Sequence, residues 1–322
     1  MKTLKSLPLA MGSILLAVLA CQSPPNPTPD IARLDSIPAD IVKMTPELDL
    51  YPPILHSDEW EQPVPLPYPI NTAGGEDSPF ITPDGNTLYF FFTPDVRVPA
   101  EQQVIDGVTG IYVSQKEENG WSFPVRVLLQ DPKKLSMDGC QFVQGNVIWF
   151  CSVRDGNMRE IDFYTSEYKD GAWKNFTNVG ERLNLEIGVG ELHVTADGSE
   201  IYFHTGPEKE GGMGGYDLWV TRLVHGAWSD AENLTTLNTA GDEGWPFVSQ
   251  DGSELWFLRT YQGSPALFRA KKVDGDWGEP ELIVSQFAGE PSLDNTGNLY
   301  FVHHYYKDAV MLEADIYIAY RK

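Results

Sequence analysis

Apolar and polar residues alternate in short runs along most of the chain, and these runs recur in the same order. Alternation with a period of two predicts β-strands. Before the second run of each copy comes a turn such as Asp84-Gly85 or Asp251-Gly252, which favours a tight hairpin because Gly adopts positive φ at little cost. Each second run contains an adjacent aromatic pair: Tyr89-Phe90, Trp149-Phe150, Tyr202-Phe203, Trp256-Phe257 and Tyr300-Phe301. Every copy is therefore predicted to begin with a β-hairpin.

A third and a fourth strand are predicted in each copy. The third corresponds to GIYVS (110–114), DFYTS (162–166), DLWVT (217–221), ALFRA (266–270) and DIYIA (315–319). The fourth carries Trp121, Trp173, Trp228 or Trp277, each just after a Gly. The fifth copy ends without such a strand, whereas Trp60 supplies one near the start of the chain. We therefore expect residues 58–322 to form a five-bladed β-propeller of four-stranded antiparallel blades, closed by an N-terminal strand that completes the last blade.

The repeat resembles a known family. Its signature P-F-x-x-x-D-G-x-x-L-[YW]-F, together with GGYDLWVT (214–221) and NLTTLNTAGDEGWPF (233–247), is similar to the WD-repeat-like propeller repeats of TolB-type periplasmic proteins. The resemblance covers all five copies, and the second copy departs from it at Gln144, where the usual Asp is absent. Relatives in this family include protein-interaction modules, parts of peptidoglycan-associated envelope proteins and propellers fused to serine peptidases. The resemblance therefore implies the fold and does not select a function.

The first twenty residues are typical of a secretion signal. Lys2 and Lys5 precede an apolar run over residues 7–19 that is too short to span a bilayer. The sequence AVLAC (17–21) resembles a bacterial lipobox, which implies a lipid anchor on Cys21, in the outer membrane because Gln follows. The alternative is an ordinary signal peptide followed by an unmodified cysteine. Residues 21–57 are rich in proline and are predicted to form a semi-extended tether.

The composition narrows the choice of partners. The chain has 23 basic and 46 acidic residues, and removal of the signal, which contains two lysines, leaves 21 basic residues and a net charge of −25. Such a field disfavours nucleic acid and attracts a basic protein, a cationic ligand or a divalent cation. The sequence GGMGG (211–215) precedes a predicted strand and not a helix, so it is not a phosphate loop. We expect a monomer without a resident cofactor or metal.

Two cysteines flank a predicted hairpin. Cys140 and Cys151 lie on either side of a turn near Gly145 and Asn146. A two-residue loop there places the cysteines opposite each other, where an oxidising periplasm would allow a disulfide. A one-residue change of register separates them and leaves two buried thiols. The sequence leaves both alternatives open.

The loops of a propeller indicate which end carries a site. The connections between second and third strands emerge at the mouth where the innermost strands begin. These connections are the longest of the chain, over residues 92–109, 152–160, 204–215, 259–265 and 303–314. Long loops on a rigid scaffold often carry binding residues, so we expect the site at this loop-rich mouth.

Polar side chains are predicted to gather at this mouth. Each innermost strand begins with a carboxylate: Glu76 or Asp77, Asp138, Glu191, Glu243 and Glu290. Five acids converging on a narrow channel would have raised pKa values. Alternatively, they cap backbone N–H groups and recur because the repeat recurs. The other candidate ligand-binding residues are His193, His204, Trp245, Arg259 and His303, of which a histidine on a strand, such as His193, is often only structural.

Three functions fit this pattern. The one we expect is a non-catalytic envelope lipoprotein whose propeller binds a protein or glycan partner at the loop-rich mouth, because the copies are regular and no nucleophile elbow is present. The second is a glycoside hydrolase that uses Asp138, Glu191 and Glu290, since five-bladed arabinanase and fructosidase propellers draw their acids from successive inner strands. The third is a divalent-metal site formed by Glu191, His193 and a neighbouring carboxylate.

Overall fold

The computed structural model describes residues 31–131, 134–188 and 190–322. The predicted signal (1–20) and the predicted lipidation site Cys21 lie outside these described residues. The described chain is almost entirely β-structure, with short helices α1 (Ile31–Asp35), α2 (Ala100–Gln103) and α3 (Glu181–Glu186). No helix within the described ranges is long and apolar enough to cross a membrane.

The strands fall into five repeat units that follow the five copies of the sequence motif. Unit 1 contains β3 (Gly75–Ile81), β4 (Thr87–Thr93), β5 (Gly110–Glu117), β6 (Gly120–Trp121) and β7 (Val125–Arg126). Unit 2 contains β8 (Ser136–Gln144), β9 (Val147–Arg154), β10 (Asp162–Lys169) and β11 (Ala172–Asn178). Unit 3 contains β12 (His193–Val194), β13 (Glu200–Thr205), β14 (Asp217–Val224), β15 (Ala227–Trp228) and β16 (Glu232–Asn233).

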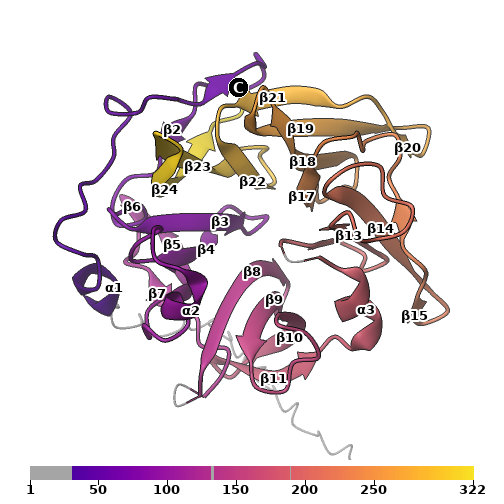
Figure 1. The fold of residues 1–322 in the computed structure, drawn as a ribbon, viewed down its shortest axis with the longest axis horizontal. Helices are drawn as coiled ribbons and strands as arrows, with labels where there is room; N and C mark the ends of the chain where they lie inside the picture. The colour runs from indigo at the N-terminus through magenta and orange to yellow at the C-terminus, as the bar shows by residue number, and fades with distance from the viewer. Residues whose placement is uncertain (1–30, 132–133, 189) are drawn as a thin grey trace, which may run out of the picture.

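The last two units also include strands from the N-terminal part of the chain. Unit 4 contains β17 (Glu243–Val248), β18 (Glu254–Tyr261), β19 (Ser264–Val273), β20 (Asp276–Trp277) and β21 (Glu281–Ser285), with β1 (Ile54–Leu55) paired to β21. Unit 5 contains β22 (Ala288–Leu293), β23 (Leu299–Lys307) and β24 (Val310–Ala319), with β2 (Val64–Pro65) paired to β24. Figure 1 shows the sheets arranged around a common axis, with β3, β8, β17 and β22 close to it.

Side chains in the hairpin turns explain why the repeats begin as predicted. In unit 1, the carboxylate of Asp84 accepts hydrogen bonds from the hydroxyl of Thr82 (2.6 Å) and the backbone N–H of Asn86 (3.1 Å). The same pattern of bonds recurs at Asp197 and Asp251 in units 3 and 4. These local bonds hold the turn in place and leave the following residue, a Gly with positive φ, to reverse the chain.

The second unit lacks this Asp and turns more tightly. Gln144 pairs directly with Val147 across a two-residue turn, and Gly139 pairs with Cys151. Cys140 and Cys151 therefore lie side by side, with their Cα atoms 5.3 Å apart, and the structure joins them in a disulfide.

The N-terminal segment around Trp60 packs against the last residues of the chain. Trp60 forms a β-bridge with Arg321, and its side chain is only 1% exposed. Its indole donates a hydrogen bond to the carbonyl of Gly297 (2.9 Å) and packs edge-on against Trp256, with ring centroids 5.5 Å apart. The guanidinium of Arg321 covers the ring at 4.3 Å. Trp60 thus occupies the interface between units 4 and 5.

A belt of rings surrounds the axis. Phe80, Phe142, His193 and Phe247 occupy the same position on the innermost strands of units 1 to 4. Successive rings of this belt touch, with centroids 5.2, 4.5 and 4.5 Å apart. The core near the axis is therefore formed by one side chain from each of these units.

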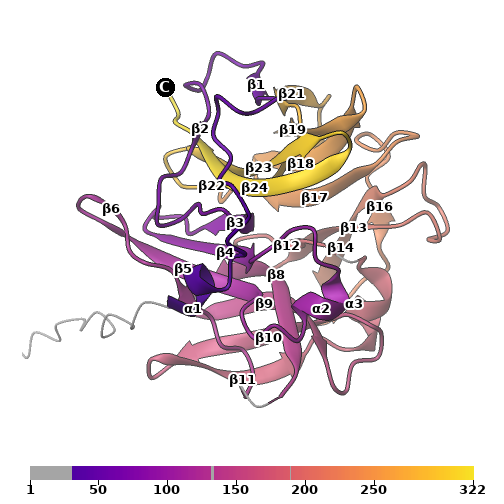
Figure 2. The ribbon, with the colours of Figure 1, turned by 60° about the vertical axis from the view of Figure 1, so that its left-hand side comes forward.

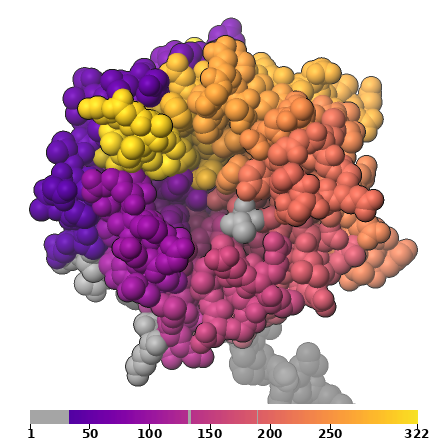
Figure 3. Space-filling view, in the orientation of Figure 1, coloured from indigo at the N-terminus to yellow at the C-terminus, as the bar shows by residue number. Residues whose placement is uncertain are grey.

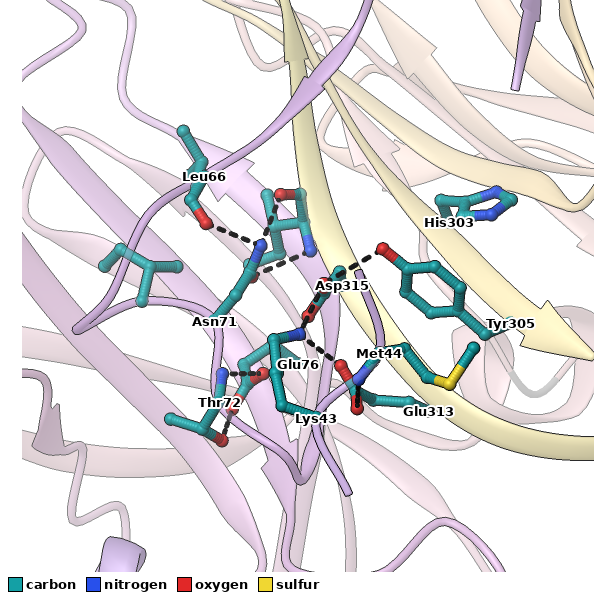
Figure 4. A network of polar contacts seen from close by, with 12 residues as sticks. Lys43, Met44, Leu66, Asn71, Thr72, Glu76, His303, Tyr305, Glu313 and Asp315 are labelled. Carbon is teal, nitrogen blue, oxygen red and sulfur yellow. Dashed lines mark hydrogen bonds and ion pairs between the residues drawn. The ribbon is translucent and has the colours of Figure 1, made fainter. Parts of the chain in front are cut away.

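Residues 31–57, which we call the strap, are docked on the units. Figure 2 shows the strap running from α1 to β1. Arg33 donates hydrogen bonds to Glu76 (2.6 Å) and to the carbonyl of Pro69 (2.9 Å). The ammonium of Lys43 lies between Asp315 (2.6 Å) and Glu313, as Figure 4 shows. All these partners are strand or turn residues at the mouth where the innermost strands begin.

The strap corrects one prediction from the sequence. A proline-rich composition predicted a semi-extended tether up to residue 57, but from residue 31 onward the segment is held by buried ion pairs. His303, which is fully buried, contacts Asp49 at 2.9 Å, and β1 adds a strand to unit 4. Partners this far away in the sequence leave no trace in local composition, which is why the prediction was wrong here.

Replacement of Trp60 tests the packing between the N-terminal segment and units 4 and 5. We expect Trp60→Ala to lower the free energy of unfolding by about 3–5 kcal/mol, the usual loss for a buried Trp. Chemical denaturation measures this change. The matched control is Trp173→Ala on the outer strand β11, where the side chain is only partly buried and the loss should be clearly smaller. Equal losses of unfolding free energy in the two variants would contradict the packing of Trp60 between units 4 and 5.

Candidate functional site

An irregularity near the start of the innermost strands decides which side chains reach the axis. In unit 1, Glu76 and Asp77 pair with β4, the register then shifts, and pairing resumes at Phe80. The same shift occurs in units 2, 4 and 5. The first residue of each irregular segment has a positive φ: Ser78 (48°), Cys140 (51°), Trp245 (50°) and Glu290 (54°). We call the place of this residue, two positions before the residue that pairs again with the second strand, the axial position. In unit 3 the residue that pairs is His193, so Glu191 occupies the axial position.

The predicted carboxylates therefore fall into two structural classes. Glu76, Asp138 and Glu243 lie two residues before the axial position and are buried inside their own units. Glu76 accepts hydrogen bonds from the backbone and hydroxyl of Thr72 and from Arg33. The expectation that five acids converge on the channel is wrong for these three carboxylates.

The other two members of this class are held in the same way. Glu243 accepts hydrogen bonds from the backbone of Thr239 (2.9 Å) and from Arg259 (2.8 Å). Asp138 accepts from the hydroxyl of Ser152 (2.6 Å) and from Arg154 (2.7 Å). Asp138 and Arg259, predicted as site residues, are thus engaged in ion pairs within their own units.

The second class of carboxylates gathers at the axis. Asp77, Glu191 and Glu290 form what we call the axial carboxyl cluster. The carboxyl of Glu290 accepts a hydrogen bond from the backbone N–H of Ser78 (2.8 Å) and is hydrogen-bonded to Asp77. On its other side, Asp77 lies 3.5 Å from the Nε2 atom of His304. Carboxyl groups from units 1 and 5 thus share one hydrogen-bond network.

Burial and mutual repulsion separate the pKa values of this cluster. Burial raises the pKa of Glu191 to about 7, and the charge of Asp77 adds to this effect. Burial and the charges of Asp77 and Glu191 raise the pKa of Glu290 well above its usual range. For Asp77, burial acts in the same direction, but contact with His304 and the hydrogen bond to Glu290 prevail and hold its pKa at about 2. Asp77 is therefore the ionised member near neutral pH.

A small cavity lies beside the cluster. It has a volume of about 30 Å³ and is lined by axial residues, including Ser78, Glu191, Trp245 and Glu290, and by Gln141. Figure 3 shows the molecule hollowed near its centre. A cavity of this size accommodates one or two water-sized groups. Two of the lining residues carry a buried oxygen that has no hydrogen-bond partner among the described residues, namely Oε1 of Gln141 and Oε2 of Glu191.

Aromatic rings stand around this opening and form what we call the aromatic rim. On one side, Tyr216 and Trp245 pack with ring centroids 6.2 Å apart. On the other side, Phe287 stacks on Tyr306 at 4.5 Å, and Tyr51 of the strap packs on Phe287 at 5.4 Å. Tyr51 and Tyr216 are each 42% exposed. The rim therefore offers aromatic surface to a ligand.

The predicted histidines have structural roles. His193 is sandwiched between two rings of the belt, its Nδ1 accepts the backbone N–H of Val248 (2.6 Å), and burial lowers its pKa to about 3. His204 accepts the backbone N–H of Trp245 (3.2 Å) and packs against the indole. His303 is buried against Asp49. These contacts bury all three side chains, of which His193 also borders the axial cavity.

The structure does not support the predicted metal site. His193 belongs to the ring belt, and its Nδ1 lone pair is engaged by a backbone N–H, so it is not positioned as a ligand together with Glu191. No group of three or more His, Cys, Asp or Glu side chains in the described parts of the chain is arranged to hold a metal ion.

Two of the predicted long loops are instead extended hairpins. Strands β18 and β19 continue to a turn at 262–263, and β23 and β24 continue to a turn at 308–309. Irregular connections remain at 94–109, 155–161 and 206–216. Continuous ladder pairing was not evident from the sequence because these hairpins lack regular alternation near their tips.

Sequence reasoning missed several residues of the site. Gln141, Ser78, Tyr216 and Phe287 were not singled out. For the axial position, a signal exists in the sequence: in units 1, 4 and 5, the axial residue directly precedes a proline, at 79, 246 and 291. Aligning the copies on this proline would have separated Glu290 from the buried Glu243.

No protein-family model matches the chain, and no curated protein matches it. Solved structures are similar in fold. A chain described as a glycoside hydrolase has a TM-score of 0.50 at 10% identity, over 87% of this chain and 96% of that one. An endo-arabinase from Bacteroides thetaiotaomicron has 0.47 at 15% identity, over 76% and 93%. TolB from Acinetobacter baumannii has 0.45 at 13% identity, over 78% and 56%. At these identities, the similarity concerns the fold alone.

The pKa shifts predict how stability depends on pH. Glu191, Asp315 and Glu313 have folded-state pKa values raised by burial to about 7, 7 and 8. A raised carboxyl pKa means that the folded state binds its proton more tightly, so this stability is lost as the pH rises through the folded pKa. His193 acts oppositely: its pKa of about 3 means that stability is lost as the pH falls below about 6.5. Above about pH 6 the loss from the three carboxyls outweighs the contribution of the single histidine, so stability should fall as the pH rises from 6 to 8.5.

Thermal unfolding at pH 6 and pH 8.5 checks this expectation. We expect the Tm to be several degrees lower at pH 8.5, since about 1 kcal/mol shifts the Tm of a large domain by roughly 2–4 °C. Glu313→Gln should reduce this difference, whereas Glu118→Gln, on an exposed turn, should leave it unchanged. A Tm that is equal or higher at pH 8.5 would show that the buried carboxyls do not control stability.

Proposed function

We propose that the protein is a non-catalytic binding module of the bacterial cell envelope that holds a protein or glycan partner at its loop-rich mouth. The observation that carries the proposal is the aromatic rim around the axial carboxyl cluster. Tyr216 and Trp245 on one side and Phe287 and Tyr306 on the other flank hydrogen-bonding carboxyls. Aromatic faces beside a few polar groups are the usual composition of a recognition site.

The proposal includes a fold of five blades, each equal to one repeat unit with WD-repeat-like strands. Units 5 and 1 belong to one nine-stranded sheet only through a single parallel bridge between Ala314 and Gly75. Division at this bridge gives five antiparallel blades. Strand β2 then becomes the outer strand of the last blade and closes the ring, which leaves no open edge between the first and last blades.

The proposal also places the protein on a membrane through a lipid on Cys21, in the outer membrane. Between Cys21 and the start of α1 at Ile31, ten residues reach at most about 33–36 Å. Because the strap contacts the loop-rich mouth, such an anchor would keep the mouth close to the membrane. Membrane fractionation of a Cys21→Ser variant tests this part of the proposal.

Substitution of the aromatic rim tests the binding role. We expect Tyr216→Ala combined with Tyr306→Ala to weaken binding to a glycan array or to envelope proteins by at least about tenfold, because each lost aromatic contact removes roughly 1 kcal/mol or more. The matched control is Tyr168→Ala. Tyr168 is 40% exposed and packs edge-on against Trp173, much as Tyr216 packs against Trp245, but it lies on β10, two strands away from the innermost strand β8 of its unit. Equal binding by the rim variant and the control variant would show that the mouth is not the binding site.

A glycoside hydrolase is the second candidate, because one observation favours it. The pKa values of Asp77 and Glu191 are driven apart, to about 2 and about 7, which is how paired carboxyls take the roles of base and acid. Two observations oppose it. Asp77 and Glu290 are hydrogen-bonded to each other, far closer than the roughly 5–9.5 Å that glycosidases need. The cavity beside Glu191 is also small, about 30 Å³.

The two candidates differ in what happens to oligosaccharides. Under the binding proposal, incubation with a panel of plant and algal oligosaccharides should release no sugar above the level of a Glu191→Gln variant, because the hydrogen bond between Asp77 and Glu290 leaves no room for a sugar between these two carboxyls. Product chromatography measures this. Release by the natural protein that disappears in the variant would establish the hydrolase and overturn the binding proposal.

A further inference from the structure

The cavity at the axis is built to receive a hydrogen-bond donor. The side chain of Gln141 is 3% exposed, and its amide nitrogen donates to the carbonyl of Ser78. Its oxygen Oε1 is buried and has no partner among the described residues, and Gln141 lines the cavity. The buried oxygen Oε2 of Glu191 is in the same situation. Unpartnered buried acceptors are costly, so they indicate a bound group that donates.

The charge around the cavity selects the kind of donor. Asp77 is ionised near neutral pH, and Glu191 and Glu290 carry further negative charge when they lose their protons. His193, which also borders the cavity, is neutral and therefore does not repel a cation. A cation is thus favoured over a neutral water, and the net negative charge of the whole chain attracts it from solution.

The size of the cavity selects an ammonium group among organic cations. A volume of about 30 Å³ accepts the head of a primary amine, which is close in size to a water molecule. A guanidinium group is planar and much larger. An ammonium group has three donors and no acceptor, which matches two orphan acceptors beside a carboxylate. The aliphatic stem attached to it would then lie against the indole of Trp245, which lines the same cavity.

We propose that this axial cavity receives the ε-ammonium group of a lysine from a protein partner docked at the loop-rich mouth. The inference rests on the proposed binding function and specifies it: the partner is a protein with an exposed lysine, and the lysine enters between Gln141 and Glu191. The aromatic rim then contacts the residues on either side of this lysine.

Short peptides test the proposal. The probe is a Gly-Gly-Lys-Gly-Gly peptide with blocked ends, titrated into the full chain and followed by calorimetry and by chemical-shift changes of the Trp245 indole. We expect acetylation of the lysine, or its replacement by arginine, to weaken binding by at least about tenfold, because a charge-assisted hydrogen bond contributes roughly 1.5–3 kcal/mol. Equal binding of the lysine and acetyl-lysine peptides would overturn the proposal and leave the cavity to water.

Two variants of the cavity complete the test. Glu191→Gln should weaken binding of the lysine peptide about tenfold, and it should fold well because it removes a buried charge. Gln141→Leu should also weaken binding, since it removes the second acceptor. The control Glu118→Gln makes the same change in net charge as Glu191→Gln on an exposed outer turn and should bind normally. Equal loss in Glu191→Gln and Glu118→Gln would show that only the overall charge matters and would also overturn the proposal.

The outcome is separable from that of the proposed function. Binding of a glycan that depends on Tyr216 and Tyr306 but not on Glu191 would overturn the lysine site and leave the mouth as a binding surface. If the rim variants bind every partner as well as the natural protein does, the proposed function itself fails, whatever the peptides show.

Discussion

The register shift near the start of the innermost strands is the constraint on which the rest of the site depends. At this shift, one residue adopts a left-handed conformation and leaves the ladder. In units 1, 4 and 5 this residue lines the axial cavity, whereas in unit 2 Cys140 is bonded to Cys151 and the next residue, Gln141, lines the cavity. In unit 1 this residue is Ser78, and in unit 5 it is Glu290. A residue only two positions earlier, such as Glu76, is buried in the unit itself. A displacement of one or two residues therefore separates structural carboxyls from those of the axial cluster, since Asp77 directly follows Glu76.

The structural carboxyls belong to a module that recurs around the molecule. In units 2 and 4, Arg154 and Arg259 pair with Asp138 and Glu243, and each guanidinium also covers an aromatic ring of its own unit, at 4.6 and 4.8 Å. Such a pair offsets the cost of burying two charges because each partner also makes a further hydrogen bond within its own unit.

Unit 1 has no arginine of its own at this place, and the strap supplies one. Arg33 pairs with Glu76 and covers the ring of Phe92 at 4.6 Å. Lys43 plays a related part in unit 5, between Glu313 and Asp315, where it opposes the effect of burial on their pKa values. The strap is therefore part of the folded unit, and its docking brings the N-terminal end of the described chain to the same mouth as the candidate site.

The side chains at this mouth have features of an acid–base catalytic site and features of a binding site. Carboxyls with separated pKa values are typical of acid–base chemistry. However, Asp77 and Glu290 are hydrogen-bonded to each other, and the adjoining cavity is small, about 30 Å³. Chemistry on a sugar needs room between its carboxyls, whereas recognition of a small cationic group needs acceptors close together. The arrangement of Gln141 and Glu191 meets the second requirement.

Local sequence determined the elements of this protein. Aromatic pairs such as Tyr89-Phe90, turns such as Asp84-Gly85 and the tryptophan after each third strand predicted the repeated strands, because alternation and turn chemistry act over a few residues. Trp60 could be recognised as the missing fourth-strand tryptophan for the same reason. Only the tertiary structure decided which acid faces the axis, that residues 31–57 are docked, and that His193 belongs to a belt of rings. Those outcomes depend on partners far away in the chain, such as Asp49 for His303, and a local pattern contains no information about which distant side chain will compensate a buried charge.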